Sequence, residues 1–152
     1  MGDEFHVQWH ITNRCTLRCS HCYQDDFTPA ADLSLSELHR VLDTIFAFLD
    51  RQGRKLTVNL TGGEPLLSPA WQPLVERLAS DDRVASAGII TNGLMLSPDT
   101  VRTLASLACP VKVSAEGFTR ESYERFRGQG TWRRFLSGLD SLAAAAVPAT
   151  LM

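Results

Sequence analysis

Apolar residues recur along this chain with two periods, first at every second position and then at every third or fourth position. Over residues 5–12 they alternate with polar residues, which is typical of a strand with one buried face. From Ser34, which opens a capping box with Glu37, they recur at helical spacing as far as Gly53. A strand followed by a helix is therefore the first predicted unit of the fold.

The same alternation of strand and helix repeats along the rest of the chain. Further strands are predicted over 55–61, 87–91, 111–114 and 149–152, and further helices over about 69–78, 98–107, 121–126 and 132–146. Repeated strand–helix units with short connections predict an α/β fold with a mainly parallel sheet. Ligand sites in such folds lie at the C-terminal ends of the strands, so the residues after each strand are the first candidates for function.

Composition and charge narrow the class of protein. A chain of 152 residues, with 44% hydrophobic and 21% charged residues, is typical of one soluble globular domain, here covering residues 1–152. Its net charge of −2 gives no electrostatic reason to bind nucleic acid. No apolar run approaches the roughly 20 residues of a membrane helix, and the acidic segment 1–4 is unlike a signal peptide. We therefore expect a cytoplasmic protein without a nucleic-acid or membrane partner.

Three of the four cysteines, Cys15, Cys19 and Cys22, lie within eight positions directly after the first predicted strand. Thiolate sulfur is a soft ligand suited to iron–sulfur clusters and zinc, and this spacing lets one short loop surround one metal centre. A cubane cluster held by three thiolates has one iron with open coordination, which favours a cluster that binds a small molecule. The grouping fits a reducing compartment better than two disulfides. Cys109 precedes Pro110 and is predicted to be a buried small residue without a ligand role.

Other kinds of protein would also explain these cysteines. A thioredoxin-like redox protein would use Cys19 and Cys22 after a strand, but Cys15 would then have no role. A zinc site would need His21, His10 or His6 as a fourth ligand, yet His21 lies between two of the thiols. A non-catalytic iron–sulfur or zinc-binding module for electron transfer would account for the cysteines alone.

A second motif, Gly-Gly-Glu-Pro at residues 62–65, follows the second predicted strand. Together with the cysteine loop it resembles the radical S-adenosylmethionine (radical SAM) enzymes, and the resemblance covers most of the chain. The resemblance implies that Cys15, Cys19 and Cys22 hold a [4Fe-4S] cluster, whose open iron chelates the amino and carboxylate groups of S-adenosylmethionine (SAM). It also implies an oxidoreductase reaction in which a low-potential donor reduces the cluster, SAM is cleaved to a 5′-deoxyadenosyl radical, and the radical abstracts hydrogen from a substrate.

The resemblance also implies roles for the residues around the cluster. Gly62 and Gly63 let the backbone approach a ligand closely, and the Glu64 carboxylate would accept hydrogen bonds from the amino group of SAM. His21 stands where the family commonly has an aromatic residue near the adenine, and Tyr23 follows the third cysteine. Both rings would stack on the ligand. Outside this context, residues 62–65 would be an ordinary turn.

The region of the fourth predicted strand narrows the resemblance. Segments 114–117 (Ser-Ala-Glu-Gly) and 127–132 (Arg-Gly-Gln-Gly-Thr-Trp) are similar to Ser-Leu-Asp-Gly and Arg-Gly-x-Gly-Ser-Phe in radical SAM peptide maturases, which often carry a C-terminal SPASM domain. This implies a peptide substrate, with Ser114 and Arg127 hydrogen-bonding the carboxylate or ribose of SAM. The alternative for Arg127 is a solvated cation at a helix end. A module without catalysis would leave Glu64, Ser114 and Arg127 unexplained.

On this resemblance the predicted fold is a partial (β/α) barrel, the N-terminal portion of a radical SAM core with about the first four β/α units. The last predicted strand has no helix after it, so we expect a barrel cut off at Met152, with a compact four-strand domain as the alternative. Such a portion alone would be inactive if the remaining units are needed to enclose the radical. The modified bond, further clusters, the reductant and the oligomeric state are left open, and no residue is assigned a catalytic role.

Overall fold

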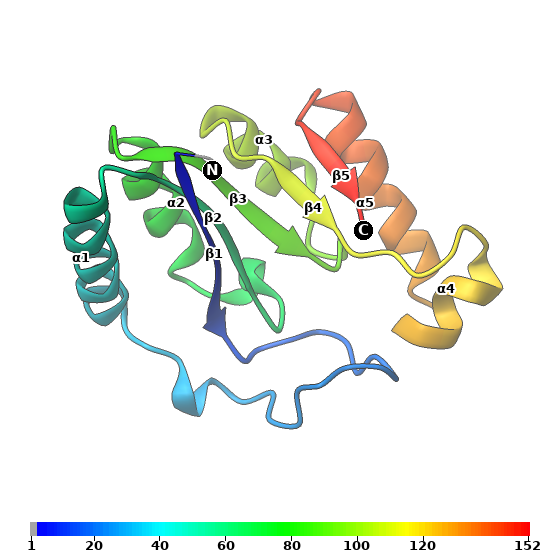
Figure 1. Cartoon of the computed structure of the whole chain (residues 1–152). Coiled ribbons are helices and arrows are strands. Elements are labelled where there is room, and N and C mark those ends of the chain that lie inside the picture. Colours follow the sequence, from blue (N-terminus) through cyan, green and yellow to red (C-terminus); the bar gives the residue numbers. More distant parts are fainter. Residues whose placement is uncertain (1–2) are drawn as a thin grey trace.

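The computed structural model describes residues 3–152, so the first two residues of the acidic N-terminal segment lie outside the described part. Five strands form one sheet in the order β1-β2-β3-β4-β5, and each pair of neighbours is parallel (Figure 1). The strands are β1 Glu4–Thr12, β2 Lys55–Gly62, β3 Val84–Thr91, β4 Val111–Val113 and β5 Ala149–Leu151. The predicted parallel α/β sheet is confirmed, and it is open, as expected of a partial barrel.

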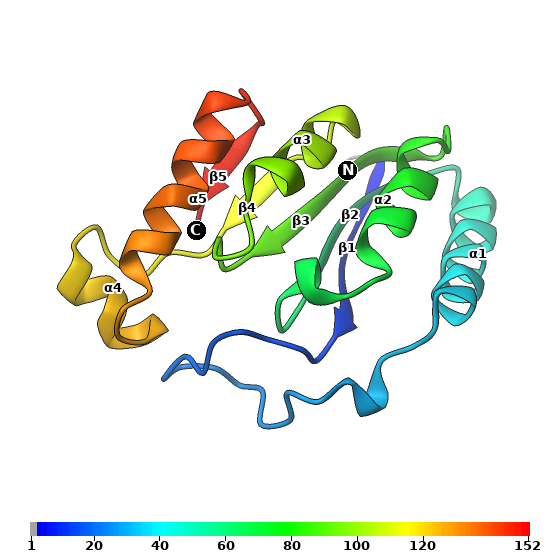
Figure 2. The same cartoon turned by 180° about the vertical axis from the view of Figure 1, so that it is seen from behind.

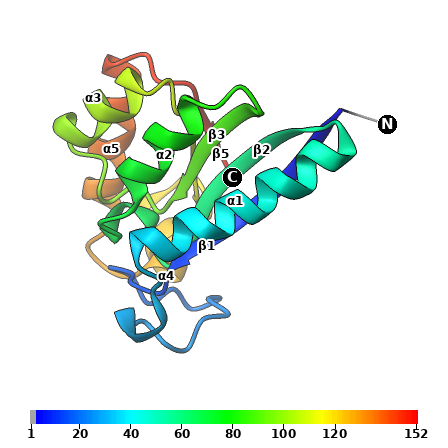
Figure 3. The same ribbon diagram turned by 90° about the vertical axis from the view of Figure 1, so that its left-hand side faces the viewer.

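Of the five helices in residues 3–152, all but α4 cover one face of the sheet. The helices are α1 Leu35–Gln52, α2 Trp71–Ala79, α3 Pro98–Ser106, α4 Arg120–Arg127 and α5 Trp132–Ala144. Helices α2, α3 and α5 lie in front of the sheet in Figure 2, and α1 runs alongside β1 in Figure 3. Helix α4 instead lies beyond the strand ends, on the side where the loop after β1 passes (Figure 1). That end of the sheet is the one predicted to carry the site.

The start and end of α1 follow from local sequence. The Ser34 side chain accepts a hydrogen bond from the Glu37 backbone N–H at 3.3 Å, while the Glu37 carboxylate accepts from the Ser34 N–H at 2.8 Å. Gly53 ends the helix with a φ of 61°, in the left-handed region that glycine adopts at little cost. The predicted helix between Ser34 and Gly53 is therefore confirmed.

The two faces of the sheet differ in polarity. On β2, Leu56, Val58 and Leu60 point towards the helices and are fully buried. The alternate residues belong to the opposite face, which is covered by no helix among residues 3–152 and includes the paired positions Ile90 and Lys112. This alternation matches a sheet whose helix-free face would line the inside of a barrel.

Several boundaries differ from prediction because pairing between distant strands extends or shortens an element. Strand β3 begins at Val84 rather than at residue 87, since Val84 pairs with Leu56 of β2. Strand β4 ends at Val113, which places Ser114 just past the strand end. Short 3-10 turns at Pro29–Ala31 and Pro65–Leu67 were not predicted. In the described part of the chain, no helix combines the length and apolar character needed to cross a membrane.

Candidate cofactor site

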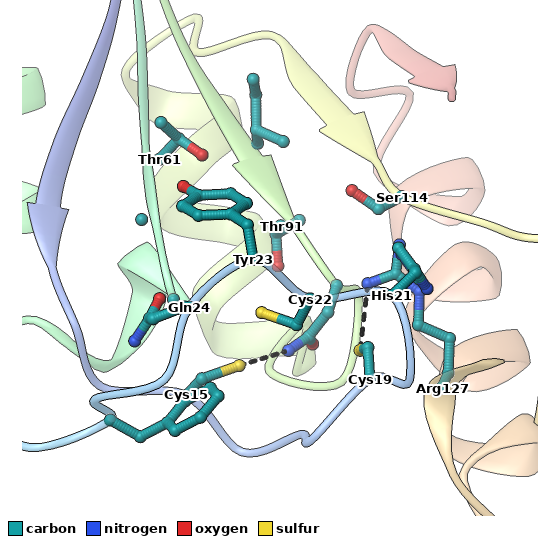
Figure 4. Close-up of a pocket in the computed structure, with 15 residues that line it drawn as sticks. Cys15, Cys19, His21, Cys22, Tyr23, Gln24, Thr61, Thr91, Ser114 and Arg127 are labelled. Carbon is teal, nitrogen blue, oxygen red and sulfur yellow. Dashed lines mark hydrogen bonds between the residues drawn. The ribbon is translucent and has the colours of Figure 1, made fainter.

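A cavity of about 190 Å³ lies between the ends of β2, β3 and β4 and the loop that follows β1 (Figure 4). All but one of the predicted site residues line it: Cys15, Cys19, His21, Cys22, Tyr23, Gly62, Gly63, Ser114 and Arg127. The exception is Glu64. Cys109 is buried in the hydrophobic core and does not line the cavity, which agrees with its predicted structural role.

The three thiols share one loop, residues 13–34, and face one cavity. Cys15 and Cys19 are half-buried and Cys22 is exposed. The Cys22 N–H donates to the Cys19 carbonyl at 3.0 Å, which makes a tight turn between these two cysteines. Burial raises the pKa of the Cys15 thiol, and the Asn92 amide contacts its sulfur at 3.9 Å.

The three thiols are a donor set that suits an iron–sulfur cluster. Within residues 3–152, no three His, Cys, Asp or Glu side chains lie close enough to hold one metal ion between them. A [4Fe-4S] cluster would take one of these thiolates on each of three irons. Three soft thiols around one cavity therefore fit that cluster, with Cys15, Cys19 and Cys22 as the residues that would hold it.

The glycine pair after β2 lets that strand end approach the start of the cysteine loop. A Cβ atom on Gly63 would lie 2.3 Å from the Arg14 carbonyl oxygen, a distance that no side chain tolerates. The Gly63 N–H donates to the Thr12 carbonyl at 2.9 Å, and the Glu64 N–H donates to the Arg14 carbonyl at 2.6 Å. Close approach was predicted towards a ligand; the structure shows that backbone packing against the loop also requires these glycines.

Glu64 lies behind the cavity and not in its lining. Its fully buried carboxylate accepts hydrogen bonds from the Thr91 hydroxyl at 2.8 Å, the Asn92 N–H at 2.8 Å and the Leu66 N–H at 3.2 Å. Burial raises the pKa of this carboxyl to about 7, although the hydrogen bonds from Asn92, Thr91 and Leu66 act in the other direction. In this structure Glu64 therefore joins the ends of β2 and β3, and its contact with the SAM amino group stays a prediction.

Arg127, at the end of α4, points into the cavity rather than into solvent, with its side chain 11% exposed. Its Nε and Nη2 both donate to the Glu116 carboxylate, the latter at 2.6 Å, and its Nη1 lies 3.5 Å from the Cys19 sulfur. Burial works against the charge, but the hydrogen bonds to Glu116 raise the pKa of the guanidinium. The alternative of a solvated helix-end cation is therefore wrong.

The sequence did not indicate a role for Glu116, which stands where radical SAM peptide maturases have the aspartate of the Ser-Leu-Asp-Gly pattern. Besides holding Arg127, its carboxylate lies 3.4 Å from the His21 ring nitrogen Nε2. The cavity is also lined by Gln24, Phe27, Thr61, Ile90, Thr91 and Asn92. Thr61 lies near the end of β2 and Thr91 ends β3, where ligand sites of parallel sheets are expected.

The rings predicted to stack on a ligand stand at the edge of the cavity. Tyr23 is 84% exposed and lies along the cysteine loop opposite the strand ends (Figure 4). The His21 ring packs edge-on against Phe126 of α4 at a centroid separation of 5.8 Å. Ser114 lies at the end of β4, where its N–H donates to the Thr91 carbonyl at 2.9 Å. The contacts of Tyr23, His21, Ser114 and Arg127 with SAM stay predictions.

Comparison with known proteins identifies relatives along almost the whole chain. The GTP 3′,8-cyclase of Ectopseudomonas mendocina (strain ymp) is 32% identical over 138 residues, which is 89% of this chain and 40% of that protein. The GTP 3′,8-cyclase of Cronobacter sakazakii (strain ATCC BAA-894) is 27% identical over 90% of this chain and 42% of its own length. The chain thus spans about two fifths of the length of these curated relatives.

Solved structures share the fold at lower identity. Streptococcus suis SuiB bound to the precursor peptide SuiA has a TM-score of 0.76 at 16% identity, covering 96% of this chain and 32% of that one. The enzyme anSMEcpe with bound AdoMet and the Kp18Cys peptide has a TM-score of 0.74 at 17% identity, covering 97% and 42%. These likenesses establish the fold.

The family itself is established by sequence. Residues 9–152 match the family model described as the radical SAM superfamily. This superfamily uses a [4Fe-4S] cluster and SAM as cofactors, and the three thiols around one cavity fit that cluster. The chain therefore belongs to the radical SAM superfamily of enzymes.

Proposed function

We propose that the whole protein cleaves SAM reductively and uses the resulting 5′-deoxyadenosyl radical to modify a peptide. The observation that carries this proposal is the single cavity lined by Cys15, Cys19, Cys22, Gly63 and Arg127 at the C-terminal edge of a parallel sheet. When bound, the cluster supplies the electron that breaks a carbon–sulfur bond of SAM. The described chain is, on this proposal, the first four β/α units of a longer barrel in a cytoplasmic enzyme served by a low-potential electron donor.

The residues of the cavity have separate tasks in this proposal. Cys15, Cys19 and Cys22 hold the cluster against the strand ends, and the Gly62–Gly63 backbone forms the cavity surface without side chains in the way. Ser114 and Arg127 orient the polar end of SAM. Holding the cluster and SAM in this way lowers the entropic cost of aligning them and excludes water from the reacting atoms.

The peptide substrate is supported by the segments 114–117 and 127–132, whose patterns resemble those of peptide maturases. A peptide substrate is also consistent with the solved structures of SuiB and anSMEcpe, each of which has a bound peptide. A second candidate is cyclisation of GTP, which the curated relatives carry out by name and which the 32% identity favours. Both candidates share the SAM-cleaving step and differ in what receives the radical.

An anaerobic assay of the whole protein tests both levels of the proposal. Protein carrying a reconstituted cluster is reduced with dithionite in the presence of SAM, and 5′-deoxyadenosine is followed by mass spectrometry. Synthetic peptides encoded by short reading frames beside the gene are added in parallel with GTP. We expect 5′-deoxyadenosine in every reaction and a mass change in one peptide.

The outcomes separate the two levels. A cyclised product of GTP without any peptide modification would replace the peptide substrate with the nucleotide. A cluster that is fully reduced and yet yields no 5′-deoxyadenosine would overturn the radical reaction itself.

A further inference from the structure

A single carboxylate closes the base of the cysteine loop. Asp32 Oδ2 accepts hydrogen bonds from the Thr12 hydroxyl at 2.6 Å and from Arg14 Nε at 3.2 Å. Its Oδ1 accepts the Asn13 backbone N–H at 2.9 Å. Asp32 stands 18 to 20 residues after these partners, and its side chain is only 13% exposed. One side chain thus joins the two ends of the segment that carries all three candidate cluster ligands.

The partners of Asp32 are themselves fixed to the sheet. Thr12 ends β1, and its carbonyl accepts the Gly63 N–H at 2.9 Å. The Arg14 carbonyl accepts the Glu64 N–H at 2.6 Å, while the Arg14 N–H donates to the Thr12 hydroxyl at 3.1 Å. Cys15 is the next residue after Arg14. The position of the first thiol is therefore determined by a network that runs from Asp32 through Arg14 to the end of β2.

The rest of the loop contacts the body of the fold through Asn92, through Phe126 and through the Arg127–Glu116 pair described above. The Ser20 N–H donates to the Phe126 carbonyl at 3.0 Å, and the Asn92 amide donates to the Thr16 hydroxyl at 3.3 Å. Among the residues that the structure describes, the neighbouring acid Asp26 accepts only from the nearby Thr28. Asp25 is exposed and has no hydrogen bond in the described structure. Asp32 is therefore the acid that this loop uses to close itself.

We propose that Asp32 is a positioning residue for the cluster, holding the loop base so that the three thiols face the cavity before any iron is bound. It touches neither the cluster ligands nor the cavity and acts through Arg14 and the adjoining Cys15. The proposal rests on the proposed function in one respect, that the occupant of the thiols is an iron–sulfur cluster.

The test replaces Asp32 by asparagine in the whole protein. The amide has nearly the same shape, but it turns an N–H group towards the donors of Thr12, Asn13 or Arg14. Iron and sulfide are titrated anaerobically into metal-free protein, and the absorbance near 400 nm and the EPR spectrum of the reduced cluster are recorded. Because residues that orient metal ligands typically change metal affinity by 10- to 100-fold, we expect Asp32→Asn to need about tenfold more iron for half reconstitution.

Three further variants make the result specific. Asp25→Asn, an equivalent change at an exposed site of the same loop, should reconstitute like the wild type. Thr12→Val removes one donor to Asp32 and the acceptor of the Arg14 N–H, but Asp32 keeps its bonds from Asn13 and Arg14, so the loss should be smaller than for Asp32→Asn. Asp32→Glu restores a carboxylate on a longer side chain and should recover part of the iron binding.

Limited trypsin digestion of the metal-free protein provides a readout that does not depend on the cluster. Arg18 is exposed within the loop, so Asp32→Asn should be cut there faster than the wild type and Asp25→Asn. If the wild type binds no cluster, the proposed function fails while this digestion still tests the loop closure. Equal iron titrations and equal digestion rates for Asp32→Asn and Asp25→Asn would overturn the proposal. A loss of iron that only follows a loss of folded protein by circular dichroism would overturn it as well.

Discussion

The two walls of the cavity are built in opposite ways. On the strand side, Glu64, Thr91 and Asn92 are at most 5% exposed and are joined by hydrogen bonds across the ends of β2 and β3. On the loop side, Cys22 and Tyr23 are exposed, and the segment has no regular structure longer than one 3-10 turn. The first wall belongs to the sheet, whereas the second is a long connection fastened at a few points.

This difference indicates how the site divides its work. The strand side is rigid because sheet pairing and burial already fix it, so it presents the same surface whether or not a cofactor is bound. The loop side supplies the soft ligands, and its shape depends on a few anchors and on the cluster itself. Substitutions on the loop side should therefore change cluster binding, and substitutions on the strand side should change the stability of the fold.

The largest expected effect is on the loop side. Replacing Cys15, Cys19 or Cys22 by alanine removes the ligand of one iron, so the absorbance near 400 nm after reconstitution should disappear in each variant. Cys109 lies in the buried core, and burial raises the pKa of its thiol to about 12. Cys109→Ala should therefore keep the cluster. Iron analysis measures the cluster in the loop variants and in Cys109→Ala, and a thermal melt measures whether each variant is folded. Full iron content in all three loop variants would contradict the prediction that these cysteines hold the cluster.

The strand side is best tested where it touches the loop. Gly63→Ala places a methyl group 2.3 Å from the Arg14 carbonyl, and backbone on both sides must move, so we expect a loss of roughly 3 kcal/mol in the free energy of unfolding. Gly53→Ala is the matched control, since no atom lies within 4 Å and only its left-handed conformation is strained, at about 1 kcal/mol. Urea unfolding of the metal-free protein measures both. Equal losses would show that the two walls are not tightly packed at Gly63.

Much of the strand side could be predicted from the sequence, because its determinants are local. Alternating apolar residues place the strands, and the cap at Ser34 starts α1 where predicted. The rule that parallel strands end at one edge then brings Gly63 and Ser114 to the same cavity. The start of β3 was missed because it depends on pairing with β2, which no local pattern shows.

The loop side was predictable in its ligands but not in its anchors. Cysteine spacing indicated the cluster, whereas the bonds from Asp32 and Glu116 join residues 11 to 20 positions apart in segments without periodicity. Such contacts depend on the path of the loop in space. The orientation of Glu64 was missed for a related reason, since a carboxylate beside two glycines can turn towards a ligand or towards the neighbouring strand.

The buried carboxylate of Glu64 predicts a specific pH dependence on the strand side. Its pKa of about 7 in the folded protein exceeds the ordinary 4.5, so the folded state holds this proton more tightly than the unfolded state. Stability from this group is therefore fully present below pH 4.5 and is lost as the pH rises through 7. Between pH 5.5 and 8 the loss is about 2 kcal/mol at about 1.4 kcal/mol per pKa unit.

Glu64→Gln has no such proton, so its unfolding free energy should lack this part of the pH dependence even though its overall stability is lower. Urea unfolding of the metal-free wild type and variant at pH 5.5 and pH 8 isolates the difference, because all other groups titrate in both proteins. Identical pH profiles would mean that the carboxylate is not held in a buried environment. The strand side would then be less rigid than the comparison requires.

The smallest expected effect concerns Glu116, which connects the two walls by holding Arg127 beside Cys19. Glu116→Gln leaves the Arg127 guanidinium without its charged partner. Arg127 is 11% exposed but Glu116 is 29% exposed, so we expect a loss of only about 1 kcal/mol in unfolding free energy.

Glu116→Asp keeps the charge and should lose less. Asp50→Asn, which affects an exposed pair with Arg83, should show no measurable change. Urea unfolding at low and high salt measures all three variants, and the Glu116 effect should persist in salt because burial limits screening. If Glu116→Gln unfolds like Asp50→Asn under both conditions, the two walls are not joined through this pair and each must be treated as independent.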